Sequence, residues 1–106
     1  MFENATTIYV RPGMVEQVLA LLRAEVVPAL KSHEGFINLC LLPQYASHTL
    51  TVISLWSCRT HAIAAEAACA YRRGIAKLEA LLVNGANGLR HRRTDSRLYI
   101  AGPSPN

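Results

Sequence analysis

The sequence predicts an α+β fold: a ferredoxin-like βαββαβ domain whose four-stranded antiparallel sheet carries two helices on one face. Two observations favour this class. Four short runs rich in β-branched and apolar residues and two longer segments of helical periodicity follow one another in that order. With 106 residues the chain can form one hydrophobic core but not two, so residues 1–106 are expected to be a single domain. Right-handed crossovers then place both helices on the same side of the sheet.

The first part of the chain predicts a strand followed by a helix. "TTIYV", Thr6–Val10, is rich in β-branched residues and stops at "RPG". From Met14 to about Ser32, apolar residues recur at spacings of three, four and seven, which indicates one buried stripe along a helix. Pro28 is expected to end or kink this helix, because proline lacks a backbone donor and clashes with the preceding turn.

The middle of the chain predicts a hairpin followed by a second helix. The apolar runs Phe36–Leu42 and Thr49–Trp56 flank "PQYASH", which is typical of two paired strands buried on both faces. A long helix is expected from about Arg59 to Val83, with Ser57 or Thr60 as its cap.

The last part predicts a basic loop and a fourth strand. "LRHRRTDSR", Leu89–Arg97, contains much of the basic excess and is interpreted as a solvated connection, although its clustered charges could also bind phosphate. "RLYIA", Arg97–Ala101, predicts a short strand. RNA-recognition domains share the βαββαβ order, but these strands lack the aromatic motif on which bases stack, so we expect no nucleic-acid partner.

Composition points to a partner surface and to the cytoplasm. Of the residues, 51% are hydrophobic and only 17% are charged. A small monomer cannot easily bury so many apolar side chains in its own core. We therefore expect a homodimer in which the open faces of the two sheets pack together. Charges such as Glu66 interrupt the longest apolar stretches, and no secretory signal precedes them, so no membrane contact is expected. Three cysteines without a CxxC pair indicate a reducing compartment.

The sequence resembles the antibiotic biosynthesis monooxygenase (ABM) superfamily of dimeric α+β barrels. The resemblance rests on "VRPG", on "VVPALKSHEGFINL" and on a Trp-Ser opening followed by "AYRRGIAKLEALL", and it covers roughly residues 6 to 101. The last segment is most similar to the quinol-monooxygenase and autoinducer-degrading branch. Members range from cofactor-free oxygenases of phenolic substrates to heme-degrading enzymes and proteins without known activity, so the resemblance alone does not define a function.

Several residues of the better-known branches are replaced here. Three positions at which the heme-degrading branch carries Asn, Trp and His hold Thr6, Ala65 and Ile75. The polyketide-oxidising branch has a pocket-lining Trp at the end of strand three, which Trp56 matches. Its remaining polar positions hold side chains that cannot hydrogen-bond, namely Val52, Ala62 and Ala76.

Four residues are therefore candidates for a site. Strand alternation places Ser54 and Trp56 on one face, and the same reasoning places Asn38 of the neighbouring strand beside them. Tyr71 could present a hydroxyl from the second helix. The competing interpretation is a hydrogen bond to backbone or to a neighbouring strand for Asn38, and an ordinary half-buried helical side chain for Tyr71. For Trp56 it is core packing under the second helix, and there the two interpretations are equally supported.

We hypothesise a cofactor-independent monooxygenase that acts on a small aromatic or quinol-like compound. Trp56 would form one wall of the catalytic pocket. Asn38, Ser54 or Tyr71 would bind the substrate and orient one of its oxygen atoms. The alternative is a non-catalytic dimeric binding or structural module, which the missing family residues favour. No metal or other cofactor is expected, because the histidines lack ligand spacing and no glycine-rich nucleotide loop is present.

Overall fold

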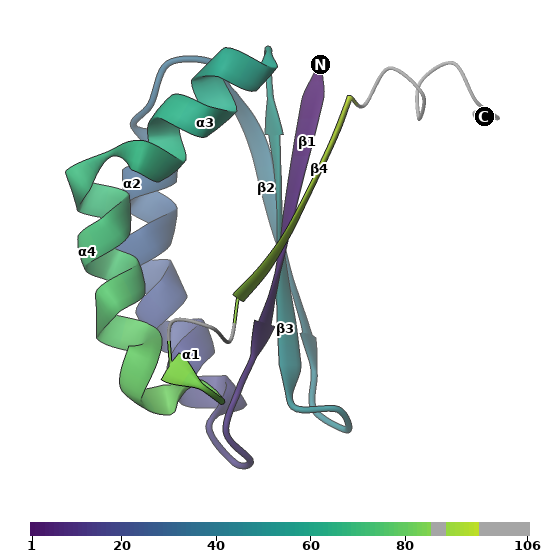
Figure 1. The fold of residues 1–106 in the computed structure, drawn as a ribbon, viewed down its shortest axis with the longest axis vertical. Helices are drawn as coiled ribbons and strands as arrows, with labels where there is room; N and C mark the ends of the chain where they lie inside the picture. Colours follow the sequence, from purple (N-terminus) through teal and green to yellow (C-terminus); the bar gives the residue numbers. More distant parts are fainter. Residues whose placement is uncertain (86–88, 96–106) are drawn as a thin grey trace, which may run out of the picture.

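A four-stranded antiparallel sheet forms one layer of the protein, and helices form the other. The computed structural model describes residues 1–85 and 89–95, the last six of these as backbone. The strand order is β2-β3-β1-β4, and the helices cover one side of the sheet (Figure 1). The strand bounds are β1 Phe2–Tyr9, β2 Phe36–Gln44, β3 Thr49–Trp56 and β4 Leu89–Asp95. The predicted α+β class is confirmed.

The two central strands alternate between buried and partly exposed residues as a sheet with one covered face requires. In β3 the burial pattern has a period of two, with Leu50, Val52, Ser54 and Trp56 on the helix side. In β1 the buried residues are Phe2, Asn4, Thr6 and Ile8. This strand begins four residues before the predicted start, because polar Asn4 occupies a buried position that composition alone did not suggest.

The first helical segment is continuous but not uniform. It consists of α1 Val15–Leu21, the π-helix η1 Leu22–Val26, and α2 Val27–Lys31. Pro28 therefore does not end the helix; instead the backbone widens in the turn just before it. The amide of Val27 donates to the carbonyl of Leu22, five residues back. A widened turn accommodates a residue that cannot donate its own amide hydrogen.

The second helical segment is broken, which the sequence did not predict. It consists of α3 Arg59–Ala67, α4 Cys69–Leu78 and the 3₁₀ turn η2 Glu79–Leu81. Ala68 interrupts it with extended backbone angles (φ −71°, ψ 147°). Cys58 occupies the N-cap of α3, and no side chain caps that end, so the predicted cap by Ser57 or Thr60 is wrong.

A glycine turn lets the start of α3 pack against the chain before β2. Gly35 has a φ of +86°, and a Cβ there would lie 2.4 Å from the ring of His61. Its carbonyl accepts a hydrogen bond of 2.8 Å from the amide of Ser57. Glycine is therefore needed at this position both for backbone angle and for space.

The basic segment is a strand rather than a loop. Residues of β4 pair with β1 from Ile8↔Leu89 to Phe2↔Asp95, which puts β4 at the sheet edge. The prediction of a solvated connection at Leu89–Arg97 is therefore wrong for 89–95. The predicted fourth strand at Arg97–Ala101 lies outside the described residues.

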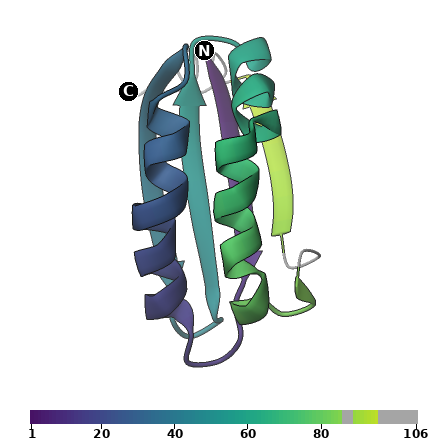
Figure 2. The same ribbon diagram turned by 90° about the vertical axis from the view of Figure 1, so that its left-hand side faces the viewer.

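The hydrophobic core lies between the two layers, where the helical segments run side by side across the sheet (Figure 2). Its largest fully buried side chain is Trp56, followed by Ile8, Leu22, Leu50, Leu78 and Leu82. In the described part of the chain, no helix is long and apolar enough to cross a bilayer. The outer face of the sheet has no helix over it in the described residues, so the expected burial of the hairpin on both faces is not achieved within one chain.

Candidate functional site

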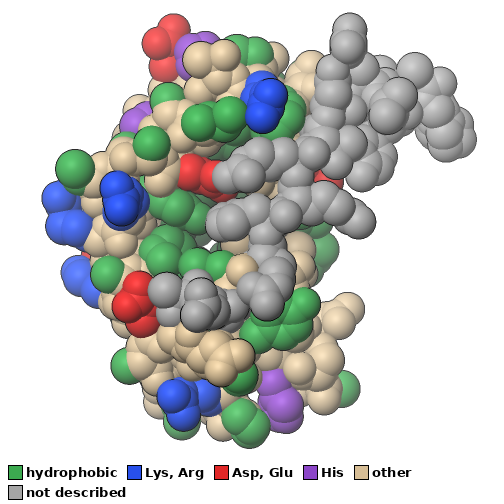
Figure 3. Space-filling view, viewed as in Figure 1, with side chains coloured by type: hydrophobic (Ala, Val, Ile, Leu, Met, Phe, Trp, Pro, Cys, Tyr) green, Lys and Arg blue, Asp and Glu red, His purple; other side chains and the backbone are tan. Residues whose placement is uncertain are grey.

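A cavity lies between the sheet and the helices. It contains about 320 Å³ of space free of atoms, part of it open to solvent, and the centre of a water molecule can occupy about 10 Å³ of it. Figure 3 shows apolar side chains gathered around a hollow between the two layers. In this conformation the space suits about one water molecule, so a ring-sized ligand would require side chains of the wall to move.

The cavity has a strand side and a helix side. Residues from β1 and β3 form the first: Asn4, Thr6, Ile8, Val52 and Ser54. Residues from the helices form the second: Leu22, Val26, Leu30, Glu66, Tyr71 and Ile75. The strand residues share a face because they alternate along each strand and are paired, Asn4 with Ser54 and Thr6 with Val52.

Close packing of the two helical segments shapes the helix side. Gly74 of α4 lies against η1, and a Cβ on it would be 2.9 Å from Cγ2 of Val26 and 3.0 Å from the carbonyl oxygen of Glu25. Lys77 Nζ and Glu25 Oε1 add an ion pair of 2.9 Å at the surface, which contributes little because water screens it. Gly74 is thus the residue that lets the π-helical turn approach α4 above the cavity.

A buried amide and a carboxylate form the polar part of the cavity. Asn4 is 3% exposed, and its Nδ2 donates a hydrogen bond to Oε2 of Glu66, which joins β1 to α3. This contact fixes the amide orientation, because a flipped amide would turn its oxygen toward the carboxylate. Asn4 Oδ1 is buried and has no hydrogen-bond partner among the described residues. A buried acceptor without a donor costs about 1–3 kcal/mol, so the site favours a ligand or water that donates to it.

Ser54 connects this polar part to Trp56. Trp56 Nε1 donates to Ser54 Oγ at 2.9 Å, and Ser54 Oγ donates to the Asn4 carbonyl at 3.4 Å. Ser54 lines the cavity, as predicted for a site residue. Trp56 is fully buried, packs edge-to-face on Phe36 with ring centroids 5.5 Å apart, and does not line the cavity. Its placement matches the core-packing interpretation, with its indole one hydrogen bond away from the site.

Asn38 lies on the other face of the sheet, so its expected position beside Ser54 is wrong. The cause is a bulge in β2 between Phe36 and Asn38, which shifts the alternation by one residue. Leu39, rather than Asn38, is therefore paired with Ser54. Asn38 is exposed, and its Oδ1 accepts a hydrogen bond of 2.8 Å from the Leu39 amide.

Tyr71 lines the cavity from α4, as the sequence suggested. The sequence interpretation missed Asn4 and Glu66. Position alone could have indicated Asn4: if the strand is extended backward from Ile8 with a period of two, residues 6, 4 and 2 share its buried face. Glu66 was noted only as a charge that interrupts an apolar stretch, because a local pattern cannot show that α3 turns this residue toward β1.

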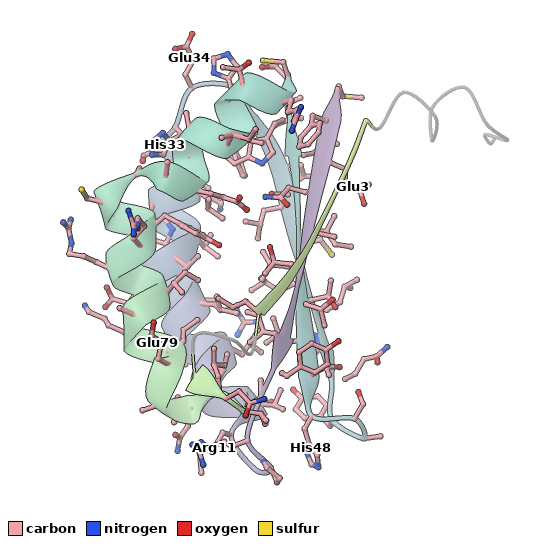
Figure 4. The ribbon with its side chains drawn as sticks, in the orientation of Figure 1. Glu3, Arg11, His33, Glu34, His48 and Glu79 are labelled. Carbon is pink, nitrogen blue, oxygen red and sulfur yellow. The ribbon has the colours of Figure 1, made fainter. Side chains whose placement is uncertain are left out.

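Several other charged or titratable side chains of the described chain lie away from the cavity. Figure 4 shows Glu3, Arg11, His33, Glu34, His48 and Glu79 around the periphery of the molecule. Among the residues that line the cavity in the described chain, Glu66 alone carries a charge. No group of three or more His, Cys, Asp or Glu residues in the described segments could hold a metal ion. The expected absence of a cofactor stays a prediction.

No family model matches the sequence, and no curated protein matches it either. Solved structures do match. PA3566 from Pseudomonas aeruginosa is 23% identical with a TM-score of 0.68, covering 88% of this chain and 90% of its own. A structure named antibiotic biosynthesis monooxygenase is 16% identical with a TM-score of 0.72, covering 90% and 97%. A candidate antibiotic biosynthesis monooxygenase from Nitrosomonas europaea is 11% identical with a TM-score of 0.73, covering 90% and 97%.

The chain has the ABM fold. The resemblance found in the sequence is thereby confirmed at the level of the superfamily fold, whereas the branch is not distinguished. At these identities the comparison concerns the fold alone, and the ABM fold is compatible with more than one chemistry. Any function must therefore be argued from the cavity and the side chains that line it.

Proposed function

We propose that the cavity binds a small hydroxy-aromatic, quinol-like compound and that the protein oxidises it without a cofactor. The observation that carries this proposal is the unpartnered Oδ1 of buried Asn4, held in a cavity whose other walls are largely apolar. A phenolic hydroxyl supplies the missing hydrogen-bond donor, and its ring suits the apolar walls. Glu66 lies beside this acceptor and is the group that takes the hydroxyl proton.

The chemistry balances without a further reductant. Loss of the proton makes the ring electron-rich, and the ring transfers one electron to dioxygen. The two radicals combine to form a carbon–oxygen bond and a ring peroxide. Cleavage of the O–O bond, with loss of the proton on that carbon, leaves a quinone carbonyl and releases water. One oxygen atom enters the product, and the substrate provides all four electrons.

The residues of the chain would orient the substrate and accept its proton. Asn4 would orient the hydroxyl, and its amide hydrogen bond would hold Glu66 next to it. Tyr71 and Ile75 lie on the helix side of the cavity and would move to admit a ring. Since water hardly fits in the closed cavity, the peroxide would be protected from solvent.

The test uses fluorescence and oxygen uptake together. Trp56 reports on the cavity through Ser54, so hydroquinones and naphthols that bind should change its emission. Asn4→Ala should weaken binding about tenfold, the value of one lost hydrogen bond. Asn38→Ala is the matched control, because it removes the same side chain from the opposite face. Unchanged emission together with no oxygen uptake by the wild type would exclude the proposal.

A non-catalytic binding module is the second candidate. It is favoured by the small free space, which requires rearrangement before a ring can enter. Such a protein would show the same emission change and the same effect of Asn4→Ala, with no uptake of oxygen above the rate of autoxidation.

We also propose that two copies associate through their open sheet faces. Ile37, Leu42 and Tyr9 are 45%, 44% and 41% exposed, and Cys40 lies between the first two on β2. A second copy would cover these apolar groups. Sedimentation should show a dimer at micromolar concentration, and Leu42→Glu should weaken it; a stable wild-type monomer would exclude this assembly.

The three cysteines are exposed and unpaired, which supports a cytoplasmic location.

A further inference from the structure

The polar part of the cavity offers a ligand two hydrogen-bond acceptors that lie beside the same amide group. Asn4 Nδ2 donates to Glu66 Oε2, so the carboxylate lies next to the amide nitrogen. Asn4 Oδ1 is bonded to the same carbon as that nitrogen, and it is buried without a donor among the described residues. A carboxylate has about four acceptor positions, so Glu66 can accept from a ligand while it keeps its bond to Asn4.

The two side-chain donors that follow on β3 are already directed elsewhere. Trp56 Nε1 donates to Ser54 Oγ, and Ser54 Oγ donates to the backbone carbonyl of Asn4. Neither hydrogen is therefore available to Asn4 Oδ1 or to the carboxylate. A ligand that satisfies both acceptors must bring its own hydrogens.

A single hydroxyl group cannot satisfy both acceptors, because it carries only one hydrogen. If that hydrogen is donated to Asn4 Oδ1, it is not directed at Glu66, which has to take it. If Glu66 takes it, the phenolate oxygen that remains has nothing to donate to Oδ1, and two acceptors face each other. A second hydroxyl on the adjacent ring carbon removes this conflict. One hydroxyl then gives its proton to Glu66, and the other donates to Asn4 before and after that transfer.

The rest of the lining favours two hydroxyls on the same edge of the ring. Most of it is apolar, and these side chains come from both layers: Ile8, Leu22, Val26, Leu30, Val52 and Ile75. They suit a ring edge that carries only carbon and hydrogen. A hydroxyl at the far end of the ring would point away from both Asn4 and Glu66, and it would lose water without gaining either acceptor.

We infer that this cavity selects an aromatic ring with two adjacent hydroxyl groups, a catechol-type compound, and that Asn4 and Glu66 together determine this specificity. The inference rests on the proposed function and narrows its substrate class. Each of the two acceptors receives one hydroxyl, and the pair fixes the orientation of the ring in its own plane. A ring with one hydroxyl, or with two at opposite ends, can use only one acceptor at a time.

The test compares two isomers that differ only in where the second hydroxyl lies, catechol and hydroquinone. Their affinities for the full chain are measured by calorimetry without oxygen, so that neither compound is oxidised. The wild type should bind catechol about tenfold more tightly, the value of one additional hydrogen bond. Phenol, which has one hydroxyl, should bind about as weakly as hydroquinone. Glu66→Gln should remove most of the preference for catechol, because the charged acceptor of the second hydroxyl is lost.

Glu16→Gln is the matched control, because it removes the same charge from a surface glutamate that does not line the cavity. This variant should keep the full preference; an equal loss in both variants would mean that only overall charge matters, and would overturn the inference. Full preference in Glu66→Gln would also overturn it, since the second hydroxyl would then be bound elsewhere.

The wild-type comparison needs no variant and therefore stands even if Glu66→Gln does not fold. Equal affinity for catechol and hydroquinone would mean that another polar residue of the lining, such as Thr6 or Tyr71, accepts the second hydroxyl, and the inference would be wrong. If none of the three compounds binds, the proposed function fails as well. If hydroquinone binds at least as tightly as catechol and is oxidised when oxygen is admitted, only the inference fails.

Discussion

Within the described residues, a buried and an exposed hydrogen bond, each to a glutamate of the helices, differ in their surroundings. Inside the cavity, Asn4 of β1 donates to Glu66 of α3. At the surface, the Tyr45 hydroxyl in the turn between β2 and β3 donates to Glu16 of α1. Asn4 is 3% exposed and Tyr45 is 53% exposed. Water can replace either partner at the surface, whereas in the cavity only a ligand or a trapped water can do so.

The difference shows how similar contacts acquire different roles. The buried contact leaves a second atom, Asn4 Oδ1, unsatisfied, and that atom gives the cavity a chemical preference. The surface contact holds a turn against a helix and leaves nothing that a ligand must satisfy. A glutamate that hydrogen-bonds to a tyrosine or an asparagine therefore does not by itself indicate a binding site. The Asn4–Glu66 contact indicates one because it is buried and leaves Asn4 Oδ1 unsatisfied.

The largest expected effect separates the two glutamates. Glu66→Gln should lower oxygen uptake about 100-fold or more on a compound that the wild type oxidises, because an amide cannot take the hydroxyl proton. Glu16→Gln removes the same charge at the surface and should leave uptake unchanged. Glutamine is nearly the same size as glutamate, so circular dichroism and melting should show both variants folded. Full activity of Glu66→Gln would assign proton transfer to another group.

The fold could be predicted from the sequence where one pattern dominated. β3 was located correctly at Thr49–Trp56, because an apolar, β-branched run that follows a turn and precedes a helix favours a strand of that length. The break at Ala68 could not be predicted, since the alanine-rich segment favours helix throughout and tertiary packing overrides that preference. The same limit applies to β4, whose charged residues are unusual in a strand and form one here through pairing with β1.

The site could be predicted only in part, for a related reason. Ser54 and Tyr71 were found because strand and helix periodicity place them correctly. Asn38 was misplaced because a single bulged residue reverses every later position on the strand. Asn4 and Glu66 come together from residues 62 positions apart, and no local spacing encodes such a contact.

Trp56 sharpens the comparison, because it is buried like Asn4 yet lies outside the cavity lining. Trp56→Phe should lower the free energy of unfolding by about 1–3 kcal/mol, since the core loses volume and Ser54 loses its donor. Ligand affinity should change less than twofold, within the error of most titrations. Calorimetry is the appropriate measurement, because the variant lacks the fluorophore. A large loss of affinity with little loss of stability would instead make Trp56 part of the binding wall.

The smallest expected effect concerns Tyr45. Its hydrogen bond to Glu16 raises the pKa of the phenol above the ordinary value of 10.0, and the negative charge of Glu16 adds to this. Because the folded pKa exceeds the unfolded one, the contact contributes to stability fully below pH 10.0 and loses that contribution as the pH rises through the folded pKa. Glu16→Gln should therefore lower the pH at which one tyrosine ionises, as measured by ultraviolet absorbance. The melting temperature of this variant should approach that of the wild type only at high pH.

Glu25→Gln removes an equal charge from a glutamate paired with Lys77 and should leave the titration unchanged. If Glu16→Gln has no effect either, the surface contact is not maintained in solution, whereas the buried contact of Asn4 with Glu66 is shielded from water.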